Sequence, residues 1–511
     1  FQNMSESGSL GDVSEISNFQ DNPTFYNETI ESIEDKKYYL DTNKYHKSCW
    51  MVMFVICIYS LSSSMFFPIT KSLIYQKVCI QQGYMELECR DKKDLSSNHL
   101  IQTETNNIFM IVGVIFSIIA IFSSIYIGKL SDDVSRKYAL MIPFIGLIFS
   151  DLMLISMANK MEEKNQHLFA VSEIIFSFFG GYMTIFATAF SYISQATCNN
   201  LKKRSQYISY LEGAIGLGSA LGFFFGSFFG SYEYTDAYLI ILVLHFFCIV
   251  VIFLAKDMTP EPDDFNKTSV LNETLAERIQ DRFTGWRRIL WDEDGKKNIA
   301  LLYTTLAFFL SFLALMGSNR ILFFYLKNKF HWDAGEYSQF KMPMQCIATF
   351  FAIFIYPLFK HNDVKDSTLA LIGLVSRGFG RLLIAVAWND SIIYSLVLLE
   401  AFNKFGPSGM RSMMAQTVYT TELGRVFSLI SVVEAFGNLF SVIIFHTLYN
   451  FTILFMPELP FIIMATICIP AVFFVILADE AIQKLVRKRY ERQKLMEPKL
   501  IIKVEKDTQI D

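Results

Sequence analysis

The sequence has few of the patterns that mark metalloproteins and soluble enzymes. Its eight cysteines form no CxxC pair, no GxxxxGK[ST] phosphate-binding loop is present, and only 18% of the 511 residues are charged. These absences exclude a cysteine-rich metal centre and ATP as an energy source. No His-rich stretch or Ser/His/Asp cluster on facing helices is apparent, so we expect no enzymatic activity, cofactor or metal. The net charge of −4 gives no argument for nucleic acid, and we expect no such partner.

The N-terminal segment, residues 1–47, lacks apolar periodicity and the apolar core of a signal peptide. It is rich in Ser, Asn, Asp and Glu, a composition that buries too little apolar surface to fold alone. We therefore expect a disordered tail. Its true start is left open, because the first residue is Phe1 rather than Met.

Long apolar stretches are what the sequence has in abundance. Hydrophobic residues make up 52% of the chain, which contains 50 phenylalanines and has a mean hydropathy of +0.33. A bilayer core of about 30 Å is crossed by roughly twenty helical residues, and only helices and closed barrels satisfy their backbone groups in lipid. The pattern predicts an all-α membrane protein with about twelve transmembrane helices, near residues 48–69, 107–129, 138–158, 168–194, 206–230, 237–255, 298–326, 337–358, 368–387, 392–410, 426–447 and 458–478.

A polar segment, residues 256–297, separates six of these helices from the other six. The division predicts an N-terminal six-helix bundle over residues 48–255 and a C-terminal one over residues 298–478. Lys and Arg are concentrated in the short loops on one side of the helices, and loops of that kind stay in the cytosol. Both tails, the second over residues 479–511, and the central loop are therefore expected to be cytosolic.

Cys79 and Cys89 share a polar loop that this topology places outside the cytosol. Outside the cytosol thiols are not kept reduced, so a disulfide between the two is expected. Two free thiols are the alternative.

The charged turn between the second and third predicted helices contains the sharpest local motif. It reads GKLSDDVSRK from Gly128 and resembles the G-x-L-[ST]-D-[RK]-x-G-R-[RK] signature of the major facilitator superfamily. In that signature the glycine, here Gly128, permits close helix approach. The acid and the base, here Asp132 and Arg136, tie helix ends together in one conformation of the transport cycle. Asp133 and Ser135 depart from the signature, and a turn that only anchors helix ends is the alternative.

The predicted fifth helix contains a stripe of small residues. Gly218, Gly222, Gly226 and Gly230 recur every fourth residue and so share one face. A partner helix can pack on such a face with the two backbones close together. The stripe predicts a packing surface, and it also suits a helix that moves against its partner during transport.

A narrower resemblance lies in the fifth helix and in the last two helices. The segments YISYLEGAIG and TELGRVFSL are similar to the solute-carrier family of the proton-coupled folate transporter and its thymic stromal and lysosomal relatives. The resemblance implies that Glu212 couples proton and substrate movement and that Arg411 takes part in proton and substrate binding. Arg136 matches the basic residue of the family's second-to-third loop. This sequence departs from the family pattern in two places. The seventh predicted helix reads MGSNR, ending at Arg320, where the folate carrier has a histidine. Gln195, at the end of the fourth predicted helix, stands where the family usually has an aspartate.

Ionisable residues inside the predicted helices give a separate indication, since each is costly in a bilayer unless it faces a cavity or a partner. The basic ones all lie in the second half: Arg320, Lys341, Arg377, Arg381, Lys404 and Arg411. The acids are Asp151, Glu173, Glu212, Glu400 and Glu434. A cation-rich second half favours an anionic or zwitterionic organic substrate, because guanidinium groups bind carboxylates with two hydrogen bonds. The candidates for substrate binding or coupling are Glu212, Arg411, Arg377 and Arg320.

Structural roles are the alternatives for several of these residues. Arg377 and Arg381 are four residues apart and so face the same way, where acids of a neighbouring helix would pair with them. Glu400 and Lys404 have the spacing to satisfy each other. His245 is a lone histidine in an apolar helix, a position typical of hydrogen-bonded packing.

Together these features predict a monomeric secondary active transporter that moves an organic anion across a lipid bilayer by alternating access, with protons as candidate co-substrates. A receptor or scaffold that keeps the fold without transporting is the alternative. The plasma membrane and endosomal or lysosomal membranes are both open, because NPTF from Asn22 and EPKLI from Glu497 only resemble sorting signals.

Overall fold

The computed structural model describes residues 42–91, 98–161, 165–197, 201–228, 233–257, 280, 284–287, 289–291, 297–418 and 423–507. In these ranges the chain forms helices and one isolated bridge, between Trp291 and Lys297. Nearly all of the predicted N-terminal tail and most of the predicted central loop lie outside the described residues.

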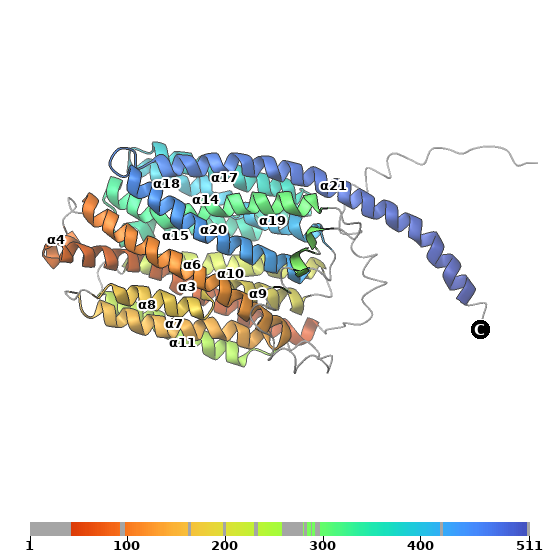
Figure 1. Ribbon diagram of the computed structural model, residues 1–511, viewed down its shortest axis with the longest axis horizontal. Coiled ribbons are helices and arrows are strands. Elements are labelled where there is room, and N and C mark those ends of the chain that lie inside the picture. Colours follow the sequence, from red (N-terminus) through yellow and green to blue (C-terminus); the bar gives the residue numbers. More distant parts are fainter. Residues whose placement is uncertain are drawn as a thin grey trace, which may run out of the picture.

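The first half of the chain builds the helices that are red to yellow-green in Figure 1. They are α3 (Thr42–Gln81), α4 (Glu86–Asp91), α6 (His99–Asp133), α7 (Arg136–Ala158), α8 (His167–Phe178), α9 (Gly181–Ala196), α10 (Leu201–Phe228) and α11 (Tyr234–Leu254). Together α8 and α9 make the fourth span. The break between them contains Gly180 and Gly181, whose φ angles of +103° and +63° suit glycine because it has no Cβ.

The second half builds the helices that are green to blue. They are α14 (Ile299–Phe330), α15 (Ala334–Phe350), the π-helical turn η2 (Phe351–Ile355), α16 (Tyr356–His361), α17 (Asp366–Val386), α18 (Asp390–Leu399), the 3-10 turn η3 (Glu400–Phe402), α19 (Phe405–Gln416), α20 (Leu423–Thr452) and α21 (Leu459–Asp507). The last of these continues far beyond the predicted end of the twelfth span.

Eleven helices of the described part are long and apolar enough to cross a membrane. The remaining predicted span, the tenth, is interrupted and consists of α18, η3 and α19. Pro407 explains part of the interruption, because proline has no N–H to bond the carbonyl oxygen of Asn403 four residues earlier. Arg377 donates to that oxygen instead, at 3.1 Å.

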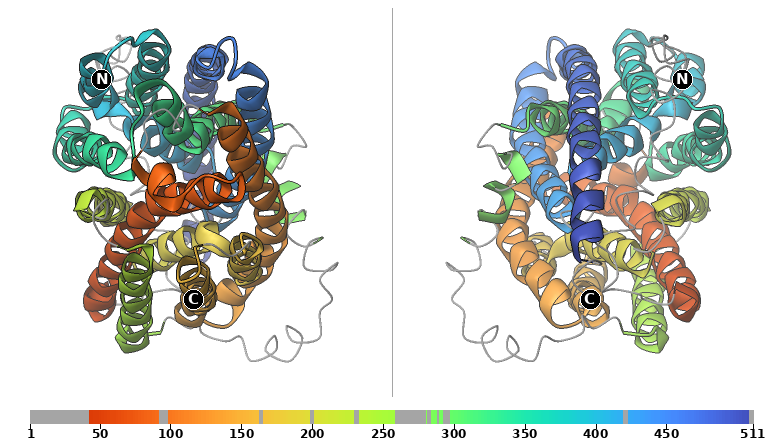
Figure 2. Two further views of the ribbon diagram at one scale, coloured as in Figure 1. Left: turned by 90° about the vertical axis from the view of Figure 1, so that its left-hand side faces the viewer. Right: turned by 90° about the vertical axis from the view of Figure 1, so that its right-hand side faces the viewer.

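The helices run roughly along the long axis of the molecule, and the two halves lie side by side (Figures 1 and 2). One end of the molecule carries α4, and we call it the loop end. The other, from which α21 projects, we call the tail end. The extensive contacts that join the halves are those of α6 with α20 and of α10 with α15.

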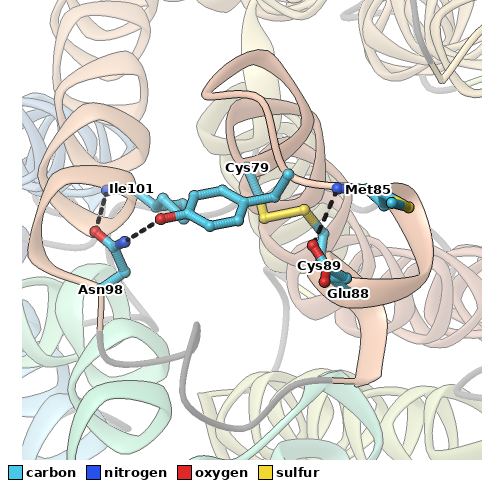
Figure 3. Close-up of a disulfide and its surroundings, with 7 residues drawn as sticks. Cys79, Met85, Glu88, Cys89, Asn98 and Ile101 are labelled. Carbon is cyan, nitrogen blue, oxygen red and sulfur yellow. Dashed lines mark hydrogen bonds between the residues drawn. A yellow bond between two sulfur atoms is a disulfide. The ribbon is translucent and has the colours of Figure 1, made fainter.

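At the loop end a disulfide joins Cys79 in the last turns of α3 to Cys89 in α4 (Figure 3). The same region is tied to the start of α6, where Asn98 donates to the Tyr84 hydroxyl at 3.5 Å and accepts from the Ile101 amide. The disulfide therefore holds α4 against the end of α3.

The glycine stripe of α10 packs against two different helices. A Cβ on Gly218 would lie 2.0 Å from the carbonyl oxygen of Cys57, and one on Gly222 would lie 2.2 Å from that of Leu61. Both carbonyls belong to α3, so these two glycines permit close packing inside the first half. A Cβ on Gly226 would be 3.3 Å from Ser338 Oγ in α15. The fourth glycine of the predicted stripe lies outside the described residues.

Candidate functional site

Arg411 of α19 lies between two glutamates. Its Nη1 forms an ion pair with Glu212 Oε1 of α10, and its Nη2 forms another with Glu434 Oε1 of α20 at 2.6 Å. The side chains of all three residues are 16% to 20% exposed. Because α10 belongs to the first half and the other two helices to the second, this ion triad connects the halves. The sequence placed Glu212 and Arg411 in one functional group; the structure adds Glu434.

Aromatic rings cover the guanidinium of Arg411. The ring of Phe190, from α9, lies 5.5 Å from its Cζ, and the ring of Phe308, from α14, lies 5.6 Å away. Such cation–π contacts stabilise a cation that has been removed from bulk water. Arg411 is therefore held by groups of both halves, and its donors are largely committed to carboxylates.

Lys404 lies just before α19, and its side chain reaches α10 near the triad. Its Nζ donates to Thr349 Oγ1 of α15 at 3.0 Å, and it is close enough to Glu212 for electrostatic attraction. A Cβ on Gly216 of α10 would lie 1.9 Å from this Nζ and 2.0 Å from the Thr349 hydroxyl. A side chain at Gly216 would therefore displace the Lys404 ammonium or the Thr349 hydroxyl, a role for this glycine that the sequence did not indicate. Glu400 pairs with Arg381 instead of Lys404, so the structural alternative for this pair does not hold.

Arg320 of α14 belongs to a second polar group, nearer the loop end. It donates to Asn438 Oδ1 of α20 at 2.7 Å and interacts electrostatically with Glu173 of α8 and Tyr182 of α9. Asn438 donates onward to Ser117 of α6 at 2.8 Å. Side chains of both halves therefore meet at Arg320, as at Arg411.

Lys71 is a functional candidate that the sequence analysis missed, because the first helix was predicted to end at residue 69. In the structure α3 continues to Gln81, and Lys71 donates to the carbonyl oxygens of Asn319 and Arg320 in α14, both at 3.0 Å. The signal was present in the sequence, since the residues around Lys71 remain mostly apolar up to Ile80.

The structure does not bring Arg377 into these groups, and a substrate-binding role for it stays a prediction. The side chain is 1% exposed, and its guanidinium donates to Ser311 of α14 and to Asn403. All of these contacts lie inside the second half. Arg381 pairs with Glu400, as the alternative for it proposed. Arg377 therefore stabilises the interrupted tenth span. Pro407 is the sequence signal for this role, because it leaves the Asn403 carbonyl oxygen without an N–H donor.

The structure describes part of the charged turn between α6 and α7. Ser135 caps α7 by accepting from the Tyr138 amide at 3.2 Å, and it donates to Asp257 at 2.6 Å. Arg136 donates to the carbonyl and hydroxyl oxygens of Ser191 in α9. The side chain of Asp132 lies outside the described residues. The ion pair that the signature predicts for Asp132 therefore remains a prediction. Gly128 lies in the last turns of α6.

A buried Ser/His/Asp cluster is present, contrary to the sequence analysis. Asp151 of α7 bonds His245 Nδ1 at 2.6 Å, and His245 Nε2 lies 2.8 Å from Ser62 Oγ of α3. The Ser62 hydroxyl donates to the Tyr59 carbonyl at 2.9 Å, so its proton does not point at the imidazole. His245 Nε2 then donates to Ser62, the reverse of the direction that would activate the serine as a nucleophile. All three residues are at most 3% exposed, and they join α3, α7 and α11.

Polar contacts between α6 and α20 close the loop end. Asn106 donates to the His446 carbonyl at 3.0 Å and to Asn450 Oδ1 at 2.6 Å. The Tyr449 hydroxyl donates to Gln102 at 3.1 Å. These bonds join the halves in the conformation observed here, and they involve no carboxylate.

Comparison with known proteins decides the family. Residues 52–365 match the Major Facilitator Superfamily. The chain belongs to this superfamily. The prediction made from the charged turn and the helix pattern is thereby confirmed.

The relatives of this major facilitator are solute carriers. The Gallus gallus lysosomal proton-coupled steroid conjugate and bile acid symporter SLC46A3 is 23% identical over 437 residues, covering 81% of this chain and 90% of the relative. The Drosophila melanogaster probable peptidoglycan muropeptide transporter SLC46 is 22% identical over 424 residues, covering 79% of each. The Bos taurus proton-coupled folate transporter is 23% identical over 433 residues, covering 80% and 88%. The predicted relation to this group of solute carriers is confirmed.

Solved structures show the same fold. The human organic anion transporter MFSD10 (TETRAN) superposes with a TM-score of 0.62 at 14% identity, covering 84% of this chain and 99% of the other. A D-xylose-proton symporter has a TM-score of 0.59 at 13% identity, covering 84% and 97%. The protein is thus a multi-pass membrane transporter of the major facilitator type and not an enzyme.

Proposed function

We propose that this major facilitator is a secondary active transporter of an organic anion and works by alternating access. The observation that carries the proposal is the ion triad of Glu212, Arg411 and Glu434, which joins the two halves. An inter-half ion pair is broken when the halves separate and forms again when they close, so its strength biases the transport cycle. Relatives named for steroid conjugates, bile acids, muropeptides and folate support an organic substrate with acidic groups.

The composition of the triad supports coupling to protons. It contains two carboxylates that share one guanidinium, and Lys404 attracts Glu212 without forming an ion pair with it. A proton taken up by one carboxylate loosens one ion pair without leaving Arg411 unpaired, because the other carboxylate remains bound to it. We assign this role to Glu212, because its pair is the one that crosses between the halves.

Uptake into proteoliposomes tests the proposal. Wild-type protein should accumulate at least one of four labelled compounds, a sulfated steroid, a bile acid, a muropeptide or folate, and a pH gradient should increase the accumulation. Glu212→Gln should retain exchange of that compound and lose the pH-driven increase. Glu458→Gln is the control, because Glu458 pairs with Lys329 at the loop end, away from the triad. Wild-type vesicles that accumulate none of the compounds would favour the receptor or scaffold alternative.

We further propose that the chain acts as a monomer with both termini in the cytosol, in the plasma membrane or in an endosomal or lysosomal membrane. The basic residues of the tail end, such as Arg487 and Lys488 in α21, support this orientation. Epitope tags before residue 42 and after residue 507 should both become accessible to antibody once the plasma membrane alone is permeabilised, with the organellar membranes left intact. Tags accessible from opposite faces contradict the orientation.

A further inference from the structure

Three basic side chains near the loop end have no acid of their own. Lys71 of α3, Arg320 of α14 and Lys341 of α15 form no salt bridge with any described residue, and Lys71 interacts electrostatically with both of the others. Lys71 is 7% exposed and Lys341 is 5% exposed. Elsewhere in the second half, Arg381 pairs with Glu400 and Arg411 pairs with two glutamates, whereas Arg377 has no ion-paired acid but uses its donors on Ser311 and Asn403.

The nearby acids do not balance these three cations. Glu173 interacts electrostatically with Arg320 and offsets one positive charge. Glu400 attracts Lys341, but it is already ion-paired with Arg381, which repels Lys341. The cluster of Lys71, Arg320 and Lys341, which we call the cation cluster, therefore keeps an excess of about two positive charges when its members are ionised. Such an excess is costly inside a membrane protein unless an anion compensates it.

Hydrogen-bond donors of the cation cluster are also left over. Lys71 uses two of its three ammonium donors on the α14 carbonyls. Lys341 makes no hydrogen bond to a described residue, and its Nζ lies 5.9 Å from the Tyr337 ring. Buried polar groups in native proteins normally have partners, so unused donors in one place point to a ligand that supplies acceptors.

We propose that the cation cluster binds the acidic group of the transported molecule, a sulfate or a carboxylate, and that the Arg411 triad does not. This inference rests on the proposed function and refines its substrate site. The sequence pointed to Arg411 as the anion ligand, but its guanidinium is occupied by two carboxylates that a substrate anion would have to displace. The cation cluster offers ammonium and guanidinium donors with no such competitor.

The position of the cluster links binding to the transport cycle. Lys71 comes from the first half of the chain, whereas Arg320 and Lys341 come from the second. An anion bound to all three contacts both halves and favours the conformation in which they are close together at the loop end. Release requires Lys71 to leave the α14 carbonyls.

Equilibrium binding to the purified full-length protein in detergent tests the site. The probes are a sulfated steroid, a bile acid and folate, each measured beside a derivative whose acidic group is absent or esterified. Lys341→Gln and Lys71→Gln should weaken binding of the acidic form about tenfold or more, because a charged hydrogen-bonded partner is lost, and should change binding of the uncharged form little. Lys488→Gln, an exposed lysine of α21, is the matched control and should behave as wild type.

Thermal unfolding supplies a second readout. Without ligand, Lys341→Gln should unfold at the same or a higher temperature than wild type, because it removes an uncompensated buried charge. A lysine whose role is only structural would instead lower the unfolding temperature when replaced, and that result contradicts the proposal. So does equal weakening of the acidic and uncharged probes, or acidic-probe binding that matches wild type in both variants.

The outcomes separate the two proposals. If wild-type protein neither binds nor transports any of the acidic probes, the proposed function fails and the inference fails with it. If wild-type protein transports an acidic probe and both lysine variants retain its preference over the uncharged form, only the assignment of the cation cluster fails.

Discussion

Replacing Arg411 with methionine isolates the electrostatics of the ion triad. The two glutamates then face each other without a cation. Carboxylate oxygens that bind opposite ends of one guanidinium lie roughly 5 Å apart, and two unit charges at that distance repel by about 3 kcal/mol at an effective dielectric constant of ~20. We therefore expect Arg411→Met to destabilise the protein strongly, in the range of about 3–5 kcal/mol found for broken buried ion pairs.

A second substitution should restore part of this loss. Glu212→Gln in the Arg411→Met background removes one of the two repelling charges, so the double variant should be more stable than Arg411→Met alone by up to about 3 kcal/mol. In the wild-type background the same Glu212→Gln change removes an ion pair and should destabilise. The sign of its effect thus reverses with the residue at position 411, which is the signature of direct coupling.

Thermal unfolding of the four proteins in one detergent measures this cycle. Arg411→Lys is the control, because it keeps a positive charge but cannot bind both glutamates through two separate nitrogens, as the guanidinium does. Its unfolding temperature should lie between those of wild type and Arg411→Met. Destabilisations that simply add in the double variant would show that the three side chains do not interact in the populated conformation, and the reasoning would be refuted.

Three further predictions concern packing and covalent structure. Gly222→Leu should impair transport and lower the yield of folded protein far more than Leu221→Ala. A Cβ at Gly222 would already lie 2.2 Å from a backbone oxygen, whereas Leu221 is 38% exposed. Equal effects of the two substitutions, measured by uptake and size-exclusion chromatography, would contradict the packing. Asp151→Ala should destabilise by about 1–3 kcal/mol, since it leaves the buried His245 Nδ1 without its hydrogen-bond partner, and Ser62→Ala by only about 1 kcal/mol, as judged from unfolding temperatures. Peptide mapping without reduction should recover Cys79 linked to Cys89, and two free thiols or a bridge to another cysteine would exclude the bond.

The sequence alone determined the fold class, because hydropathy in a bilayer depends on local composition. Twenty apolar residues in a row must be helical in lipid whatever their neighbours are, and the charged turn near Gly128 was enough to indicate the superfamily. The same local reasoning found Glu212 and Arg411, since an ionisable residue in an apolar run is visible without knowing its partner.

What the sequence did not decide was which charges meet. Arg377 and Arg411 look alike as arginines in apolar helices, yet one is bonded to Ser311 and Asn403 and the other to two glutamates. Lys404 and Glu400 have the spacing to pair along one helix, but Pro407 and the turn at Glu400 interrupt that helix, and the two residues bind other partners. Only the tertiary structure brings together Lys71, Arg320 and Lys341, because electrostatic interactions depend on distance in space, and these residues lie on three helices drawn from both halves of the chain.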